Sequence, residues 1–125
     1  MALAACGPPL AQISPARARA EIQQTVRTYL EAIYAGDARR AWALHSRETT
    51  AGERFEDFAQ AVRITAAQRN RVEIERIGEP HVDGARATVE VVQRLDGRAS
   101  GYRFTLVFED GRWRIHNPRP PASTR

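Results

Sequence analysis

Three Asp-Gly dipeptides divide the second half of this chain into short segments. They are Asp83-Gly84, Asp96-Gly97 and Asp110-Gly111, spaced 13 and then 14 residues apart. A tight hairpin turn needs backbone angles with positive φ, which Gly adopts without steric cost, so Asp-Gly between alternating apolar segments is a strong hairpin signal. The segments between these turns are rich in β-branched and aromatic residues. This spacing predicts four antiparallel strands in a meander.

From Arg71 onward, apolar residues recur at every second position, which is the period of a strand with one buried face. Gln93 shares the predicted inward face of its strand with Val89, Val91 and Leu95, either to serve a ligand or to bond a backbone group. Aromatic and branched residues dominate the inward faces, and most charges fall on the outer face. The predicted inward residues are Val72, Ile74, Ala87, Val89, Val91, Gln93, Leu95, Tyr102, Phe104, Leu106, Phe108, Trp113 and Ile115.

The first half of the chain has helical periodicity. Ser14-Pro15 is a good helix start, because Ser caps the free N–H groups and Pro tolerates the first helical position. We expect a helix from about residue 15 to Ala35, ended by Gly36, with Asp37 capping a second helix.

A third helix is predicted from the segment Thr50-Ala51-Gly52-Glu53. It matches the capping box, in which a Thr hydroxyl and a Glu carboxylate each accept a hydrogen bond from the other residue's backbone N–H. The expected inward residues of this helix are Phe55, Phe58, Ala59 and Val62.

These elements predict an α+β fold in which three N-terminal helices pack on a curved four-stranded antiparallel sheet. A chain of 125 residues suits one domain with one core. We expect the domain to span 15–118, after an N-terminal segment and linker at 1–14 and before a polar tail at 119–125.

All 19 basic residues are Arg, and the pI is about 10.2. A basic protein raises the question of nucleic acid as a partner. The charges are interleaved, however, with nine Arg and seven acids in residues 1–70 and ten Arg and eight acids in residues 71–125. This distribution is typical of a mixed solvated surface, and no nucleic-acid partner is expected.

The single cysteine, Cys6, lies in Leu3-Ala4-Ala5-Cys6-Gly7. This segment resembles the lipobox of bacterial lipoproteins, in which the Cys is lipidated. Only five residues precede Cys6, fewer than a signal peptide needs, so a basic and apolar extension encoded upstream of Met1 would test the assignment. The resemblance implies a cell-envelope location with a membrane link only through a lipid on Cys6; the alternative is an incidental thiol in an Ala-rich start.

The stretch from Val26 to Ser46 and the ending Asp110-Gly111-Arg112-Trp113-Arg114-Ile115 resemble the nuclear transport factor 2-like (cystatin-like α+β) superfamily. The shared features are the Ala35-Gly36-Asp37 helix junction, the Trp42-Ala43-Leu44 segment and the last hairpin. The best match within it is a group of small domains found in bacterial lipoproteins. These motifs are structural, so they identify a fold and leave the activity open.

The superfamily's cone shape implies an internal pocket. In this sequence the predicted inward side chains are mostly aromatic and few are ionisable, a pattern typical of sites that bind by shape and burial. We therefore expect a non-enzymatic domain that binds a small apolar ligand or a protein partner, as a monomer or weak dimer because the outer sheet face is charged. The predicted pocket wall consists of Tyr29, Ile33, Trp42, Phe58, Gln93, Tyr102, Phe104 and Trp113.

The alternative is an isomerase-, dehydratase- or cyclase-like enzyme that uses Tyr29 with His45 or Glu53. Ketosteroid isomerases of this fold use a Tyr on the first helix, an acidic base after the second, and a protonated acid on the sheet. Tyr29 and Glu53 stand near the first two positions, but the capping box occupies Glu53 and the inward strand faces offer no acid. No cofactor is expected, and no metal site, because His45, His81 and His116 fall on three different elements.

Overall fold

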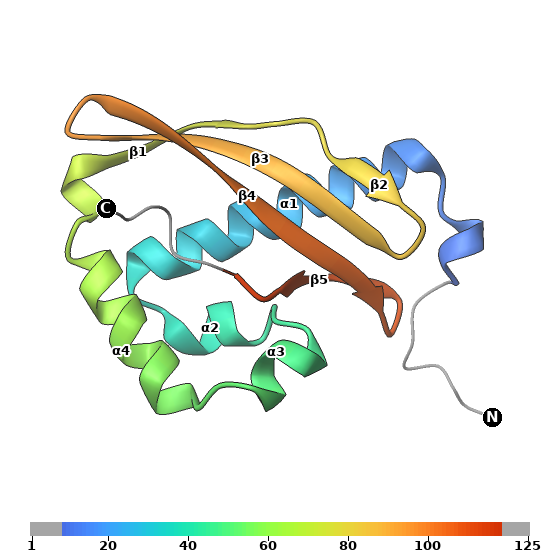
Figure 1. Cartoon of the computed structure of the whole chain (residues 1–125), viewed down its shortest axis with the longest axis horizontal. Coiled ribbons are helices and arrows are strands. Elements are labelled where there is room, and N and C mark those ends of the chain that lie inside the picture. Colours follow the sequence, from blue (N-terminus) through green and yellow to red (C-terminus); the bar gives the residue numbers. More distant parts are fainter. Residues whose placement is uncertain (1–8, 119–125) are drawn as a thin grey trace.

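The computed structural model describes residues 9–118. Helices pack against one face of a twisted antiparallel sheet, as the sequence predicts (Figure 1). The helices are η1 Leu10–Gln12, α1 Pro15–Ala35, α2 Ala38–Trp42, α3 Arg47–Ala51, α4 Phe55–Ala66 and η2 Arg69–Arg71, and the strands are β1 Val72–Ile77, β2 His81–Asp83, β3 Arg86–Leu95, β4 Arg98–Glu109 and β5 Arg112–His116. Cys6 lies outside the described residues.

The four predicted strands are β1, β3, β4 and β5, and they pair in that order. Two of the Asp-Gly turns form as predicted, since both residues have positive φ: 54° and 83° at Asp96-Gly97, and 54° and 78° at Asp110-Gly111. Positive φ at both central residues defines a type I′ turn, whose twist matches the flanking strands. In the first hairpin Asp83 pairs with Arg86, so the turn residues are Gly84 and Ala85 instead.

A short fifth strand, β2, also pairs with β3. It occupies the same edge of β3 as β1, which pairs with residues 91–95, while β2 pairs with residues 86–88. The edge is interrupted at residues 78–80. The Gly78 N–H still donates to the Glu90 carbonyl at 2.8 Å, so close that an added Cβ would lie 3.1 Å from that oxygen. Pro80 has no N–H to donate to β3.

The first helix forms with the predicted bounds. The Ser14 side chain accepts a hydrogen bond from the Arg17 backbone N–H, and Gly36 ends α1 in the left-handed conformation with φ 77°. Asp37 then caps α2 by accepting from the Arg40 N–H, as predicted.

The predicted capping box at Thr50 and Glu53 is wrong. Ser46 caps a short additional helix, α3, by accepting from the Thr49 N–H. Thr50 is therefore inside that helix, and its hydroxyl donates to the Arg47 carbonyl. The next helix, α4, starts at Phe55 with Arg54 at its N-cap and no side-chain cap, which leaves Glu53 in the connecting loop.

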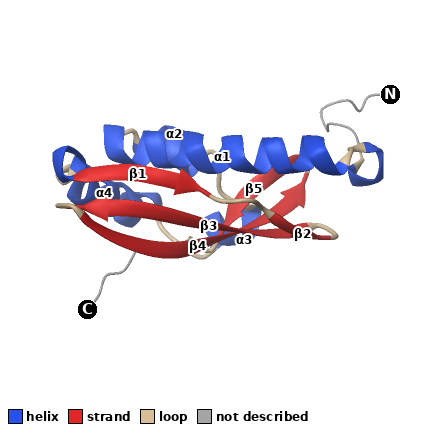
Figure 2. Cartoon of the chain, turned by 90° about the horizontal axis from the view of Figure 1, so that it is seen from above, coloured by secondary structure: helices blue, strands red, loops and turns tan. Residues whose placement is uncertain are grey.

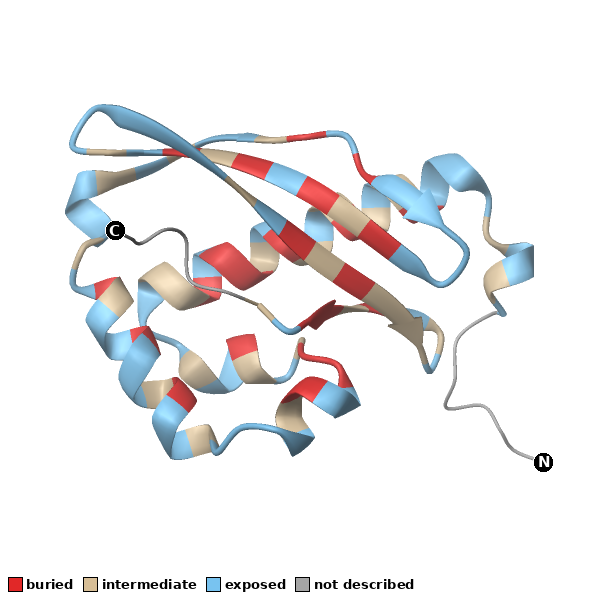
Figure 3. Cartoon of the chain, in the orientation of Figure 1, coloured by how far each residue is buried: buried red, intermediate tan, exposed pale blue. Residues whose placement is uncertain are grey.

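The core lies between α1 and the inward faces of β3, β4 and β5. Figure 2 shows α1 and α2 as one layer and the strands as another. Buried residues alternate with half-buried or exposed ones along β3 and around Phe104 and Leu106 of β4 (Figure 3). The largest fully buried side chains, each less than 2% exposed, include Trp113, Ile22, Leu106 and Ile115.

Candidate functional site

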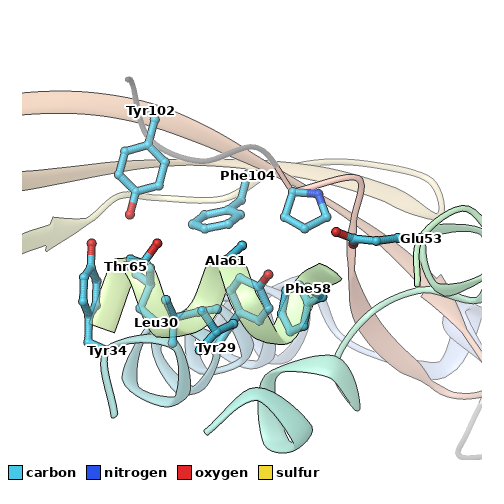
Figure 4. A pocket seen from close by; sticks show the side chains of 12 residues that line it. Tyr29, Leu30, Tyr34, Glu53, Phe58, Ala61, Thr65, Tyr102 and Phe104 are labelled. Atoms are coloured by element: carbon cyan, nitrogen blue, oxygen red, sulfur yellow. The ribbon is translucent and has the colours of Figure 1, made fainter. Parts of the chain in front are cut away.

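A cavity of about 190 Å³ opens between α1, α4 and β4. Three tyrosines line it, and these are all the tyrosines of the chain. Most of its remaining wall is aliphatic or aromatic (Figure 4). The lining residues are Tyr29, Leu30, Ile33, Tyr34, Glu53, Phe58, Ala61, Val62, Thr65, Tyr102, Phe104 and Pro118.

Helical spacing explains two of the walls. On α1 the lining residues form the pairs 29 and 33, and 30 and 34, which are one turn apart and so share a face. On α4 the lining positions 58, 61, 62 and 65 follow the same period. The third wall comes from Tyr102 and Phe104, which are two residues apart on the inward face of β4.

Tyr29 forms a buried hydrogen-bonded pair with His45. The Tyr29 hydroxyl lies 2.9 Å from His45 Nε2, and the two residues are 4% and 5% exposed. Burial lowers the pKa of His45 to about 4 and raises the pKa of Tyr29 above its ordinary range, with the charge of Glu53 as a second cause. Both groups are therefore neutral near pH 7.

Backbone pairing with β5 fixes the position of His45. The Ser46 N–H donates to the Ile115 carbonyl, and the Ile115 N–H donates to the Leu44 carbonyl, each at 2.8 Å. His45 thus forms a one-residue parallel bridge with Ile115. Its ring packs edge-on against Phe58, with ring centroids 4.7 Å apart. Among the described residues, Nδ1 of His45 has no hydrogen-bond partner.

A second polar group lies at one end of the cavity, and we call Tyr34, Gln93 and Tyr102 the polar end. The hydroxyls of Tyr34 and Tyr102 both donate to Oε1 of Gln93, each at 3.2 Å. Figure 4 shows the two hydroxyls pointing toward each other from α1 and β4. Gln93 itself is only 5% exposed and lies behind the lining residues. Burial raises the pKa of both tyrosines, so both hydroxyls keep their protons.

Glu53 lies at the opposite end of the cavity (Figure 4). Partial burial of this otherwise exposed side chain, together with the nearby charge of Asp57, raises the pKa of its carboxyl group. The predicted capping box would have engaged this carboxylate at a helix start. Because that cap does not form, the carboxylate is available to the cavity.

Of the eight residues predicted to form the pocket wall, the cavity brings together Tyr29, Ile33, Phe58, Tyr102 and Phe104. Gln93 lies behind the wall. Trp42 is outside it and packs on Phe55, Phe58 and His45, while Trp113 packs on Phe108. Both Trp side chains therefore pack in the core and do not line the cavity.

Six lining residues are absent from the predicted site residues. Tyr34 could have been found, because it is one helical turn after Leu30 on α1. The contributions of α4 could not be placed, because they depend on how that helix crosses the sheet. The missed residues are Leu30, Tyr34, Ala61, Val62, Thr65 and Pro118.

Ser46, His116 and Glu48 form another polar cluster. Ser46 Oγ lies 2.9 Å from His116 Nδ1, and His116 Nε2 lies 3.9 Å from Glu48 Oε1. This order resembles a nucleophile, base and acid, but Ser46 is fully buried and also bonds Thr49. Its role is to cap α3 and hold it on β5.

Two further observations concern other kinds of site. Within residues 9–118, no group of three or more His, Cys, Asp or Glu side chains is arranged to hold a metal ion. None of the described helices combines the length and apolar character that crossing a bilayer requires.

The comparisons with known proteins agree with this fold. A family model with the description "Putative lumazine-binding" matches residues 17–118. The comparison with curated proteins found no match. Among solved structures, a "Putative NTF2-like transpeptidase" from Campylobacter jejuni aligns with a TM-score of 0.65 at 13% identity, covering 78% of this chain and 98% of the other.

A second solved structure, the de novo designed NTF2 fold protein NT-9, aligns with a TM-score of 0.54 at 20% identity, covering 82% of this chain and 87% of its own. At these identities the two structures speak for the fold alone. Together they confirm the predicted nuclear transport factor 2-like fold.

Proposed function

Because the chain belongs to the family described as "Putative lumazine-binding", we propose that its cavity binds a small planar heteroaromatic molecule of the lumazine class. The proposed role is binding without chemical conversion. The observation that carries it is the cavity between α1, α4 and β4, whose wall is mostly apolar with hydroxyl groups at defined places.

The size of the cavity favours a small ligand over a protein segment. Its volume of about 190 Å³ is below the range of roughly 300–1,000 Å³ typical for drug-sized ligands. A bicyclic ring system suits such a space better than a peptide. Phe104 stands edge-on to Tyr29 and Tyr102, with centroids 5.8 and 5.3 Å away, so aromatic surfaces surround the space.

Filling the cavity tests this proposal. Ala61 lines it from α4, so Ala61→Trp places an indole where the ligand would lie. We expect wild-type protein to quench or shift the fluorescence of added lumazine in a saturable titration. The Ala61→Trp variant should show at least about tenfold weaker binding, because the apolar contacts that hold the ligand are already occupied.

Gln60→Trp is the matched control. It introduces the same side chain one residue earlier on α4, at an exposed position that does not line the cavity. It should bind lumazine as the wild type does. Absence of saturable binding to wild-type protein, or equal binding by Ala61→Trp, would contradict the proposal.

A second candidate function is acid–base catalysis in the same cavity. The observation that favours it is the 2.9 Å contact between Tyr29 and His45, together with Glu53 at the other end of the cavity, whose carboxylate does not cap a helix. Tyr29 would polarise a substrate carbonyl and Glu53 would accept a proton. Mass spectrometry of the ligand after incubation separates the two functions: a binding protein returns it unchanged, whereas conversion that is lost in Tyr29→Phe would favour the enzyme.

A further inference from the structure

The polar end can orient a ligand that binds in the cavity. Tyr34 and Tyr102 reach it from different elements, yet both hydroxyls donate to the same oxygen of Gln93. A carboxamide carbonyl has two lone pairs and can accept both bonds. Each phenol then keeps its own oxygen lone pairs for a third group. As long as both hydroxyls donate to Gln93, that group must be a donor.

These bonds are also long enough to rearrange. Both measure 3.2 Å, whereas hydroxyl to oxygen bonds are usually about 2.7–2.8 Å. A ligand carbonyl at this end would compete well for either phenol O–H. The polar end can therefore donate to a carbonyl and accept from an N–H, depending on how the hydroxyls rotate.

Charge narrows the choice of partner group. Tyr34 and Tyr102 are neutral phenols, Gln93 is a neutral amide, and no Arg or His lines the cavity in the part of the chain that the structure describes. An anionic group such as a carboxylate or phosphate would lose its hydration here without gaining a cation. A neutral group with N–H and C=O side by side loses much less hydration free energy on entering the cavity.

We propose that the polar end recognises the neutral cyclic amide or imide edge of a planar ligand, and that this edge fixes the ligand's orientation in the cavity. This inference rests on the proposed function and names the recognised part of the molecule. In that orientation the second ring of a bicyclic ligand would lie against the apolar lining, and its far edge would face Glu53. Lumazine has such an edge in its pyrimidinedione ring.

The test combines a change in the ligand with a change in the protein. Lumazine and 1,3-dimethyllumazine differ in the ring N–H groups, which the second compound lacks. We expect wild-type protein to bind lumazine at least about tenfold more tightly than the dimethyl compound, because the dimethyl compound has no N–H to donate to the phenol oxygens. In Tyr34→Phe or Tyr102→Phe the ratio of the two dissociation constants should fall about three- to tenfold, the effect of one neutral hydrogen bond.

Tyr29→Phe is the matched control, since it removes the third phenol hydroxyl of the same cavity, which bonds His45 and not Gln93. It should change both affinities by the same factor and keep their ratio. Circular dichroism melting of each variant checks the fold. The comparison of two ligands on wild-type protein stands even if a variant fails to fold.

The outcomes separate the two proposals. Equal binding of both compounds by wild-type protein would overturn the orientation while binding itself stands. A ratio that stays at its wild-type value in both Tyr34→Phe and Tyr102→Phe would also overturn it, because a steric clash of the methyl groups does not depend on the hydroxyls. Binding of neither compound would overturn the proposed function and this inference together.

Discussion

His45 is a neutral imidazole held in the interior, and its ionisation is tied to stability. Aromatic rings of Tyr29, Trp42 and Phe58 surround it within 4.7–5.5 Å. Burial lowers its pKa to about 4, against about 6.5 in an unfolded chain. Between these values the unfolded state binds more protons than the folded state. Stability from this residue is therefore complete above about pH 6.5 and is lost as the pH falls toward 4.

We predict that the free energy of unfolding falls by about 2 kcal/mol between pH 7 and pH 5 through His45 alone. Urea denaturation at both pH values measures it. His45→Gln keeps a polar side chain that does not titrate. The free energy of unfolding of this variant should therefore fall by about 2 kcal/mol less between pH 7 and pH 5 than that of the wild type. His81→Gln, at an exposed position on β2, is the control and should retain the wild-type difference. An unchanged pH dependence in His45→Gln would contradict the assignment.

Among the elements, α3 depends most on one side chain. Ser46 accepts from the Thr49 N–H, contacts the Thr49 hydroxyl at 2.8 Å and contacts His116 Nδ1 at 2.9 Å. It joins the helix start to β5. Thr49 in turn accepts from the Asn117 N–H at 2.7 Å, so the segment after β5 is held by the same cluster. Pro118, next in the chain, lines the cavity.

We predict that Ser46→Ala lowers the free energy of unfolding by about 1–3 kcal/mol, because it removes a helix cap and leaves buried polar groups without a partner. Thr50→Ala is the matched comparison, since its hydroxyl bonds only within α3 at a partly exposed position. Its cost should be below about 0.5 kcal/mol. Chemical denaturation of both variants measures this. Equal costs would contradict the assignment of Ser46 as the cap.

The same elements show what the sequence could predict. Local signals placed α1 from Pro15 to Ala35 and two of the hairpin turns, because caps and turns depend on neighbouring residues alone. The capping box failed because Ser46, four residues earlier, competes for the same segment. The contact between Tyr29 and His45 could not be predicted, since it depends on how the segment after α2 pairs with β5. Tertiary contacts of that kind produce no periodic pattern in the sequence.

At the scale of the whole molecule, the outer face of the sheet is charged. Glu90 pairs with Arg103 at 2.9 Å and Glu75 pairs with Arg94 at 2.8 Å, and all four side chains are about half exposed. Such pairs add little stability in water. They would, however, lose hydration at the centre of an interface, where charged residues are depleted. A large dimer contact across this face is therefore unfavourable.

We expect a monomer or a weak dimer at micromolar concentration. Light scattering should give a mass close to the 14.0 kDa of the chain. Arg103→Leu removes one ion pair and adds apolar surface, so it should raise the tendency to associate. A wild-type mass of twice the monomer value that persists on dilution would contradict this expectation.

The placement of the aromatic residues gives the molecule a built-in optical reporter. All three tyrosines of the chain line the cavity, whereas Trp42 and Trp113 do not line it. Phenol absorption responds to hydrogen bonding and polarity, so the tyrosine ultraviolet spectrum of the unlabelled protein reports on the cavity. The two indoles record the surrounding core instead. A compound that enters the cavity should perturb the first signal before the second, which makes its arrival distinguishable from unfolding.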